Sequence, residues 1–459
     1  MNKITLAAVL LFTLQSYAQN IEKSDPDSAK MEELKEQIEA EILQELSEGS
    51  PSEEEEETEE GAPSLLRWSR FGLNGYGVVN YYNYDYDTDL NLKDKLDAER
   101  LNLYLTYKFS DRISFKSEIE FEHGGTGASL EFDNQEEFGE FEQEIEQGGE
   151  VKVEQINIDF KIKPYFNIRA GRLKMYVGLA QNLDEPTHYF TTHRQEMENE
   201  ILPLGWYENG FEFYGTFARH FNYKVYVVSG LDASGFSSRS WIKWGYQTRF
   251  DMVNAESFAF AGRLDYKFGY SKNTYVGVSA YINNAAANRP KNDMDESAYV
   301  TLAEAHLTYD ERNLRFNTMF LYGNLENSNI VSHKNANLSN NLGVKRNPVG
   351  KNALGFSAEI GYDIMPLLNS ASSQRLYPFA RYDYYDTMQD TEGSIVDNPR
   401  WQRSVITGGF NWFVFPEIAV KAQYSDRRLG SENYNQSTLQ YTGEKQHERT
   451  FSLGLGFEF

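Results

Sequence analysis

The sequence predicts an all-β protein, a closed transmembrane β-barrel of 16 antiparallel strands with a short N-terminal helical and acidic extension. Three observations predict this fold. Hydrophobic and polar residues alternate with period two through sixteen segments, each close to the ~9–11 residues that cross a bilayer as a tilted strand. Short turns and long loops alternate between the segments, and aromatic residues cluster beside the short turns.

The composition excludes several other classes. The 459 residues contain no Cys, which excludes a disulfide-stapled scaffold, a thiolate zinc site and a thiol enzyme. The formal net charge of −25 argues against a nucleic-acid partner, because such proteins carry a basic face. The chain is rich in Tyr (31), Phe (30) and Gly (34). This composition suits short alternating strands.

The N-terminus predicts a secretory signal peptide over residues 1–18. Lys3 supplies the positive charge, an apolar run follows, and Ser16-Tyr17-Ala18 forms a small-x-small cleavage pattern. Residues 19–66 then form a neck, which we expect in the periplasm. Within it, residues 27–48 carry apolar side chains at helical spacing, which leaves open a frayed solvated helix or a short coiled coil between protomers. The acidic run that follows is expected to be disordered.

The remaining residues, 67–459, are expected to form the barrel. The predicted strands are 71–83, 98–109, 112–123, 151–162, 165–176, 207–218, 221–230, 257–268, 273–283, 298–309, 313–324, 352–363, 375–386, 402–414, 417–427 and 449–459. Because every backbone polar group in lipid must be paired, this sheet has to close on itself. A closed barrel of sixteen strands is too wide for side chains to fill, so water enters it.

An aromatic girdle is predicted where the strands meet the short turns, since aromatic rings tolerate both headgroups and hydrocarbon. The predicted girdle consists of Phe109, Tyr165, Phe217, Phe221, Phe268, Tyr309, Tyr362, Tyr377, Phe413 and Phe415.

The last strand ends the chain on Phe459, with apolar residues at alternate positions before it. This pattern resembles the C-terminal signature that the barrel-assembly machinery recognises. The stretch Ile168–Lys174 and the long segment that follows it through Gly205 are similar to the third-loop region of the phosphate-selective porin O and P family, found in Bacteroidetes-type bacteria. With the C-terminal pattern and the sixteen strands, residues 67–459 resemble that family. The resemblance implies an outer-membrane porin of a Gram-negative bacterium, a homotrimer surrounded by lipid and lipopolysaccharide. It further implies passive diffusion of small hydrophilic solutes or ions.

In such a porin the third loop, here residues 177–206, folds into the lumen and constricts it. Phosphate-selective members line their pores with Arg and Lys, whereas this loop is acidic, so phosphate selectivity is doubtful and we expect a bias toward cations or neutral solutes. The predicted constriction residues are Asp184, Glu185, Arg194, Glu196 and Glu198. The predicted pore-wall residues are Lys116, Glu120 and Arg169.

Other functions find less support in the sequence. The loop at 128–150 carries nine acids, which suit either loose divalent-cation binding or a solvated acidic loop. His188 and His193 with Glu196 could hold a metal but are more typical of surface residues, so no metal or other cofactor is predicted. No nucleophile elbow, zincin, P-loop or dinucleotide motif is present, so we expect no enzyme. Two alternatives remain open: a plugged barrel acting in surface adhesion or assembly of a surface complex, and a transporter of hydrophobic substrates.

Overall fold

The computed structural model describes residues 68–125, 149–179, 183–203, 205–247, 252–338, 347–431, 434–435, 440–441 and 443–459. The predicted signal peptide, the neck and nearly all of the acidic loop at 128–150 lie outside these residues. No helix among the described residues is both long enough and apolar enough to span a membrane.

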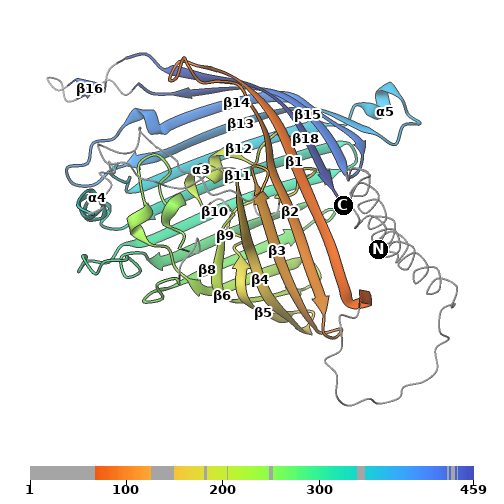
Figure 1. The fold of residues 1–459 in the computed structure, drawn as a ribbon, viewed down its shortest axis with the longest axis horizontal. Coiled ribbons are helices and arrows are strands. Elements are labelled where there is room, and N and C mark those ends of the chain that lie inside the picture. The colour runs from red at the N-terminus through yellow and green to blue at the C-terminus, as the bar shows by residue number, and fades with distance from the viewer. Residues whose placement is uncertain are drawn as a thin grey trace, which may run out of the picture. The chain divides into compact units, whose positions relative to one another are not determined.

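The described chain forms a closed antiparallel barrel in which each of sixteen strands pairs with its neighbours around the ring (Figure 1). The order is β1-β18-β15-β14 and then down to β2, so the ring closes between the first and last strands. The barrel strands are β1 (Phe71–Tyr86), β2 (Lys95–Lys108), β3 (Ile113–Glu122), β4 (Glu150–Lys163), β5 (Phe166–Lys174), β6 (Tyr207–Phe217), β7 (Phe221–Ser229), β8 (Phe258–Lys267), β9 (Tyr275–Asn284), β10 (Tyr299–Glu311), β11 (Leu314–Leu325), β12 (Asn352–Tyr362), β13 (Arg375–Asp390), β14 (Gln402–Phe415), β15 (Ile418–Leu429) and β18 (Gln446–Glu458).

All sixteen predicted strands are confirmed, with small shifts at their ends. The largest shift is in β13, which ends at Asp390 instead of residue 386. The short elements outside the barrel wall are η1 (Trp68–Arg70), α3 (Glu196–Ile201), η2 (Ala233–Gly235), η3 (Lys243–Gly245), α4 (Ser328–Ala336), α5 (Met365–Leu368), η4 (Pro399–Trp401) and the two-stranded sheet β16–β17 (Tyr434–Asn435 and Gln440–Tyr441). All but η1 and α5 lie in the loops that join the strands at one end of the barrel, which we call the long-loop end.

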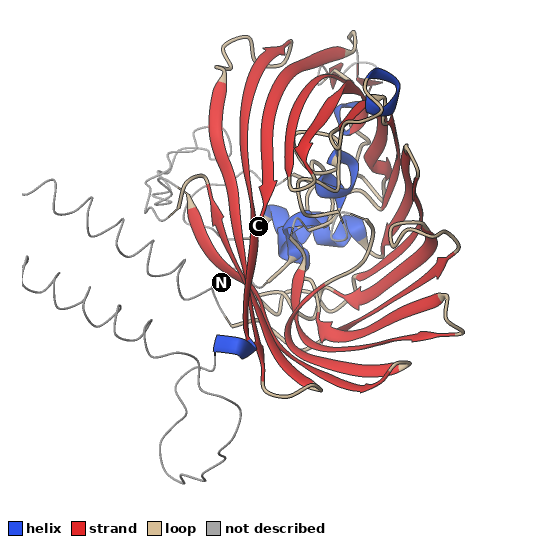
Figure 2. Ribbon diagram, turned by 90° about the vertical axis from the view of Figure 1, so that its right-hand side faces the viewer, coloured by secondary structure: helices blue, strands red, loops and turns tan. Residues whose placement is uncertain are grey.

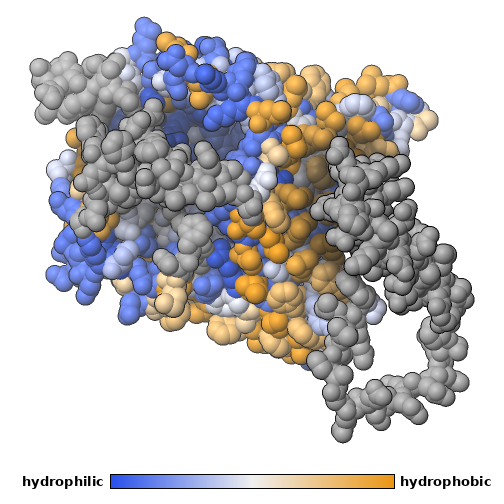
Figure 3. Space-filling model, viewed as in Figure 1, coloured by the Kyte–Doolittle hydropathy of each residue, from blue (hydrophilic) through white to orange (hydrophobic). Residues whose placement is uncertain are grey.

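Side chains alternate between the two faces of the wall, apart from register shifts in a few strand pairs. In β9, Val276, Val278 and Ile282 are exposed on the outside, while Ser279 and Tyr281 between them are buried inside. Hydrophobic residues gather over the strands toward the short-turn end, and hydrophilic residues cover the long-loop end (Figure 3). An apolar outer surface of this kind is stable only in contact with lipid or another apolar phase.

The predicted aromatic girdle is wrong at two positions. Tyr377 and Phe413 are only 1% and 4% exposed, because both face the interior and form one cluster with Phe190. In the alternation of β13 and β14, both residues occupy inward-facing positions. The prediction considered only how close they are to the short turns, which does not show the face on which a side chain lies. Six of the other predicted girdle residues are exposed on the outside: Phe109, Tyr165, Phe217, Phe268, Tyr362 and Phe415.

The seam that closes the barrel packs aromatic rings over glycines. Gly77 of β1 is paired with Phe457 of β18, and the Phe459 amide and Gly75 exchange backbone hydrogen bonds of 2.9 Å. A Cβ added at Gly75 or Gly77 would overlap the ring of Phe459 or Phe457 respectively. Because these glycines have no side chains, the C-terminal rings can pack directly against the backbone of the first strand.

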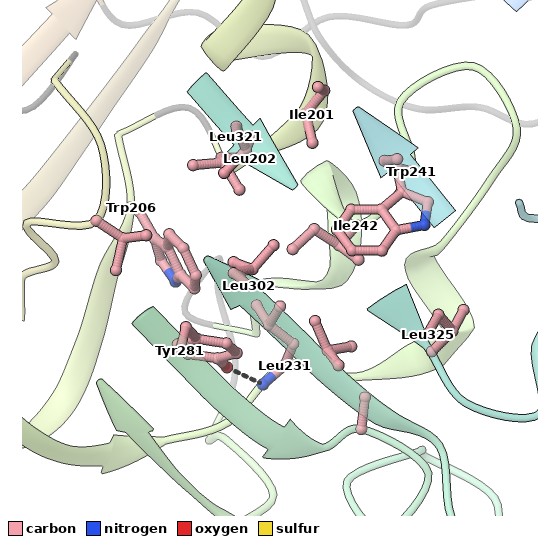
Figure 4. Close-up of a cluster of buried hydrophobic side chains, with 14 of the residues drawn as sticks. Ile201, Leu202, Trp206, Leu231, Trp241, Ile242, Tyr281, Leu302, Leu321 and Leu325 are labelled. Atoms are coloured by element: carbon pink, nitrogen blue, oxygen red, sulfur yellow. Dashed lines mark hydrogen bonds between the residues drawn. The ribbon is translucent and has the colours of Figure 1, made fainter. Parts of the chain in front are cut away.

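A large hydrophobic cluster fills part of the interior. The sequence predicted a water-filled lumen and did not predict this cluster. It joins inward-facing residues of β5 and of β7 to β14, near the long-loop end, to side chains of four loops, which are β5–β6, β7–β8, β9–β10 and β11–β12. Figure 4 shows part of this cluster. Trp241 and Ile242 from the β7–β8 loop meet Leu302, Leu321 and Leu325 of the wall, all less than 2% exposed. The loops at this end therefore fold inward and bury apolar surface, as protein cores do.

The seam predicts a specific glycine requirement. We expect Gly77→Ala to lower the free energy of unfolding by about 1–2 kcal/mol, because the Phe457 ring must leave its place. Gly262 of β8 is the matched control, since a Cβ there would meet no atom within 4 Å. Guanidinium unfolding followed by tryptophan fluorescence measures both variants. Equal stability of the two variants would contradict the role given to the seam.

Candidate functional site: the loop between β5 and β6

Helices and loops lie inside the ring of strands (Figure 2), and contacts with the inner wall show that the loop between β5 and β6 is one of them. Its middle reaches the barrel seam, where Asn80 of β1 donates to the Thr192 carbonyl at 3.1 Å and the Thr192 amide donates to Gln423 of β15 at 2.9 Å. Thr187 hydrogen-bonds Glu458 of β18. Because the loop leaves the wall at β5, these contacts carry it across the interior to the opposite side.

Basic side chains of the far wall hold the loop by its backbone. Lys421 of β15 donates to the carbonyls of Tyr189 and Thr191 at 2.7 and 2.9 Å, and its ammonium lies 3.9 Å from the centre of the Tyr189 ring. Arg315 of β11 donates to the Thr187 carbonyl at 3.2 Å. Each of these bonds joins a basic side chain to a backbone carbonyl, and Arg315 also contacts Asp310 at 3.3 Å.

Glycines on the inner wall receive the side chains of the loop. A Cβ at Gly456 would lie 2.5 Å from Pro186, one at Gly361 would lie 2.5 Å from the ring of Phe190, and one at Gly355 would overlap Met197. We call these three wall positions the glycine sockets. Strand glycines are usually unfavourable, and here each of them leaves room for one side chain of the loop.

Asp184, a predicted constriction residue, is buried in an ionic cluster. Its carboxylate contacts Lys174 at 2.7 Å, Arg100 at 3.4 Å and Arg194. Arg194 also reaches Glu120, at 3.9 Å. The structure therefore brings two predicted constriction residues and one predicted wall residue together, in a cluster that joins the loop to β2, β3 and β5. A buried carboxylate needs such partners, since unpaired it would be strongly destabilising.

Glu196 at the start of α3 pairs with the other side of the barrel. Arg427 of β15 donates to both oxygens of Glu196, at 2.6 and 2.9 Å, and Tyr385 of β13 donates at 2.5 Å. Burial alone would raise the pKa of Glu196, but the charge and hydrogen bonds of Arg427 outweigh it and lower that pKa to about 2. Glu198, in the same helix, is buried and accepts from the Leu179 amide at 3.1 Å.

The remaining predicted residues are more accessible. Glu185 and His188 form a pair at 3.0 Å. Burial alone would lower the pKa of His188, but the hydrogen bond and charge of Glu185 outweigh it and raise that pKa. On the wall, Arg169 contacts Glu212 at 2.5 Å and Asp159 at 3.4 Å. Lys116 lies 5.7 Å from the centre of the Tyr104 ring.

None of the five predicted constriction residues lines either of two cavities that adjoin the loop. The larger, about 330 Å³, is polar and lies at the short-turn end. The charged residues of its lining, with His188, are Lys224, Lys267, Lys272, Arg315, Asp265 and Asp310. The smaller, about 20 Å³, lies where Leu183, Tyr189 and Gln195 of the loop face the wall. Its wall residues are Asn317, Ser357, Glu359 and Arg381.

Sequence reasoning chose the loop and missed the wall residues that face it across the smaller cavity. It favoured the loop's acids because they are dense in the sequence, whereas most of them pair with wall cations. Arg381 and Glu359 were not among the predicted wall residues. The signal available was their cross-strand pairing, since Glu359 is directly opposite Arg381 in the register of β12 and β13.

A closed barrel that is apolar outside and charged inside is the architecture of a bacterial outer-membrane β-barrel. No protein-family profile matches this chain. A protein of Aquifex aeolicus (strain VF5), described as uncharacterized, is 27% identical over 354 residues, which cover 77% of this chain and 74% of that protein.

Similar solved structures include Salmonella typhi OmpF in complex with daunomycin (12% identity, 85% of this chain and 97% of that chain, TM-score 0.49). An anion-selective porin from Comamonas acidovorans has 11% identity, covers 85% of this chain and 100% of its own, and has a TM-score of 0.47. The outer membrane channel DcaP of Acinetobacter baumannii has 12% identity, coverages of 85% and 97%, and a TM-score of 0.47. At these values the likenesses assign no function to this chain.

The pairing of Glu196 with Arg427 predicts an acid-sensitive loop. A folded-state pKa of about 2 lies below the ~4.3 of an unfolded Glu, so the pair stabilises the docked loop above pH ~4.3 and this stabilisation is lost as the pH falls toward 2. The full effect is roughly 3 kcal/mol. Hydrogen-exchange protection of residues 189–203, corrected for the intrinsic pH dependence, measures it.

Glu196→Gln should reduce this protection at pH 7 and abolish its change between pH 4 and 2. Glu200→Gln is the matched control on the same helix, because the Glu200 side chain is more exposed and its contact with Arg403 is longer, at 3.4 Å. Protection in Glu196→Gln that equals the wild type would contradict the pairing as the anchor of the helix.

Proposed function

We propose that the protein is an outer-membrane porin, a passive diffusion channel for small hydrophilic solutes or ions. The observation that carries the proposal is the division of the wall, apolar on its outer face and charged on its inner face, in a closed ring of sixteen strands. Such a wall is stable in lipid and lets water enter the interior. Solutes then move down their own gradient, and no energy source or catalytic group is required.

In this proposal the loop between β5 and β6 forms the constriction, and its acids position it. The position of the loop would be fixed by the buried contacts of Asp184, Arg194, Glu196 and Glu198. Glu185 would face the lumen beside His188. The narrowest passage would lie at the smaller cavity, between Gln195 of the loop and the pair Glu359 and Arg381 of the wall. A constriction lined by such a charged pair selects solutes by size and by charge.

The charges of the larger cavity support a preference for anions, opposite to the one that the acids of the loop predicted. Asp265 is paired with Arg263, and Asp310 with Arg315. Lys267 and Lys272 form no ion pair with any described residue, so they add unpaired positive charge to the lining of this cavity. A narrow, water-filled passage raises the local concentration of ions of the opposite sign.

The plugged barrel remains the second candidate, because the internal hydrophobic cluster favours it. That cluster fills the interior between the wall and four loops near the long-loop end. If the passage beside it is closed, the exposed loops would carry the function, in surface adhesion or in the assembly of a surface complex. Homotrimer formation, contact with lipopolysaccharide and delivery by the barrel-assembly machinery remain predictions under both candidates.

Single-channel recording of the refolded protein in a planar bilayer separates these candidates. A porin should give ohmic conductance steps, grouped in threes if the protein is a homotrimer. A barrel that is folded by circular dichroism and by its heat-dependent gel mobility, yet gives no steps, would reject the porin and favour the plugged barrel.

The larger cavity predicts the sign of the charge preference. In a salt gradient the reversal potential should show anion preference, and the double variant Lys267→Gln, Lys272→Gln should lower the anion-to-cation permeability ratio by about two- to fivefold. Lys93→Gln is the control, since Lys93 is exposed in the β1–β2 loop and lines neither cavity. Cation preference in the wild type would contradict this assignment.

A further inference from the structure

We propose that three tyrosines at the long-loop end of β1 form a binding surface for neutral, ring-shaped polyols, that is, for sugars. The three are Tyr82, Tyr84 and Tyr86, which we call the tyrosine row. This inference rests on the proposed pore, for which it names a class of solute, and the experiment below separates the failure of one from the failure of the other.

The strand register places the tyrosine row inside the barrel. Tyr82 is directly opposite Ser452 of β18 and Tyr84 is opposite Thr450, and both partners are buried on the inner face. Between them, Asn83 is opposite Phe451, which is 40% exposed on the outer face. Because directly opposed residues share a face of the sheet, the tyrosines point inward.

The three rings follow one another along the strand. The ring centres of Tyr82 and Tyr84 are 5.9 Å apart with planes inclined by 14°, and those of Tyr84 and Tyr86 are 5.3 Å apart with planes inclined by 76°. All three side chains are partly exposed. Since alternate residues of a strand advance by about 6.7 Å, the row offers an aromatic surface that is longer than one sugar ring.

Hydrogen-bonding groups border this surface. Tyr82 donates to Glu99 of β2 at 3.0 Å, and the Tyr86 hydroxyl lies 3.2 Å from that of Thr450. Arg427 donates to Glu448 at 2.6 Å. Among the described residues, the Tyr84 hydroxyl has no hydrogen-bond partner. A carboxylate accepts several hydrogen bonds, so Glu99 and Glu448 keep lone pairs for hydroxyl groups of a ligand.

The charges beside the row favour a neutral ligand. Arg427 lies between Glu196 and Glu448, and Glu99 is 3.6 Å from Arg100, so each of these three carboxylates has a cation beside it. A sugar presents an apolar C–H face to aromatic rings and hydroxyl groups at its edge, which matches this combination of groups. An organic cation, which aromatic faces also attract, is the competing ligand that the experiment has to reject.

The tyrosine row also continues toward the proposed constriction. The next inward residue along β1 is Asn80, which donates to Tyr82 at 3.0 Å and to the Thr192 carbonyl of the loop at 3.1 Å. A solute held against the row would therefore lie between the long-loop end and the loop. Binding there raises its local concentration before the narrow passage.

The probe is maltotriose, a neutral sugar of three rings, added to the refolded full-length protein. We expect concentration-dependent block of the ion current, and binding by calorimetry of the protein in detergent. Tyr84→Ala should weaken both by about five- to tenfold, since it removes one stacking ring. Tyr84→Phe keeps the ring and should keep most of the affinity. Tyr81→Ala, an outward-facing tyrosine of the same strand, is the matched control.

Several outcomes would overturn the inference. These are no calorimetric binding of maltotriose, equal affinity in Tyr84→Ala and Tyr81→Ala, or block by tetraethylammonium at lower concentration than by the sugar. If Tyr84→Ala does not fold, full affinity in a folded Tyr84→Leu variant would overturn it as well. Sugar binding to a folded barrel without conductance supports the tyrosine row and rejects the pore, whereas conductance without sugar binding does the reverse.

Discussion

The pairing of the first strand with the last is the constraint on which the rest of this structure depends. A backbone amide or carbonyl in hydrocarbon has no water to bond, so an open sheet edge could not exist there. Residues Tyr76 to Tyr86 of β1 pair in unbroken register with β18, and the chain's last residue bonds Gly75. This closure fixes the circumference of the ring, and thereby the interior space that the loops have to share.

Inside the ring, neutralisation of charge decides where the loop between β5 and β6 lies. The chain carries a net charge of −25, yet the acids of this loop are matched by cations from two parts of the wall. These are Arg100 and Lys174 near the beginning of the loop, and Arg427 and Arg403 on the neighbouring strands β15 and β14. Buried carboxylates in such pairs act as fixed anchors, because separating them would leave charge without solvent. The charged side chains that line the passage for solutes are therefore those that take no part in these ion pairs.

The barrel could be predicted from the sequence because its signal is repeated sixteen times and each strand obeys the same alternation. The interior could not, because pairing between distant residues leaves no local pattern. Asp184 and Glu196 looked alike as loop acids, and only the structure separates their partners on opposite sides of the wall. Likewise, inward residues such as Leu302 and Leu321 satisfy the alternation whether they face water or the side chain of Trp241. Tyr377 and Phe413 lie near the short turns, and that position did not reveal their inward direction.

The contacts of the loop also constrain the order in which the molecule can fold. Thr187 bonds Glu458, which is 271 residues further along the chain, and Arg427 holds Glu196 across 231 residues. Contacts of such long sequence separation form slowly. The loop can therefore dock only when β15 and β18 have taken their places in the wall. Completion of the interior and closure of the wall then become one late, cooperative event in the folding of the chain.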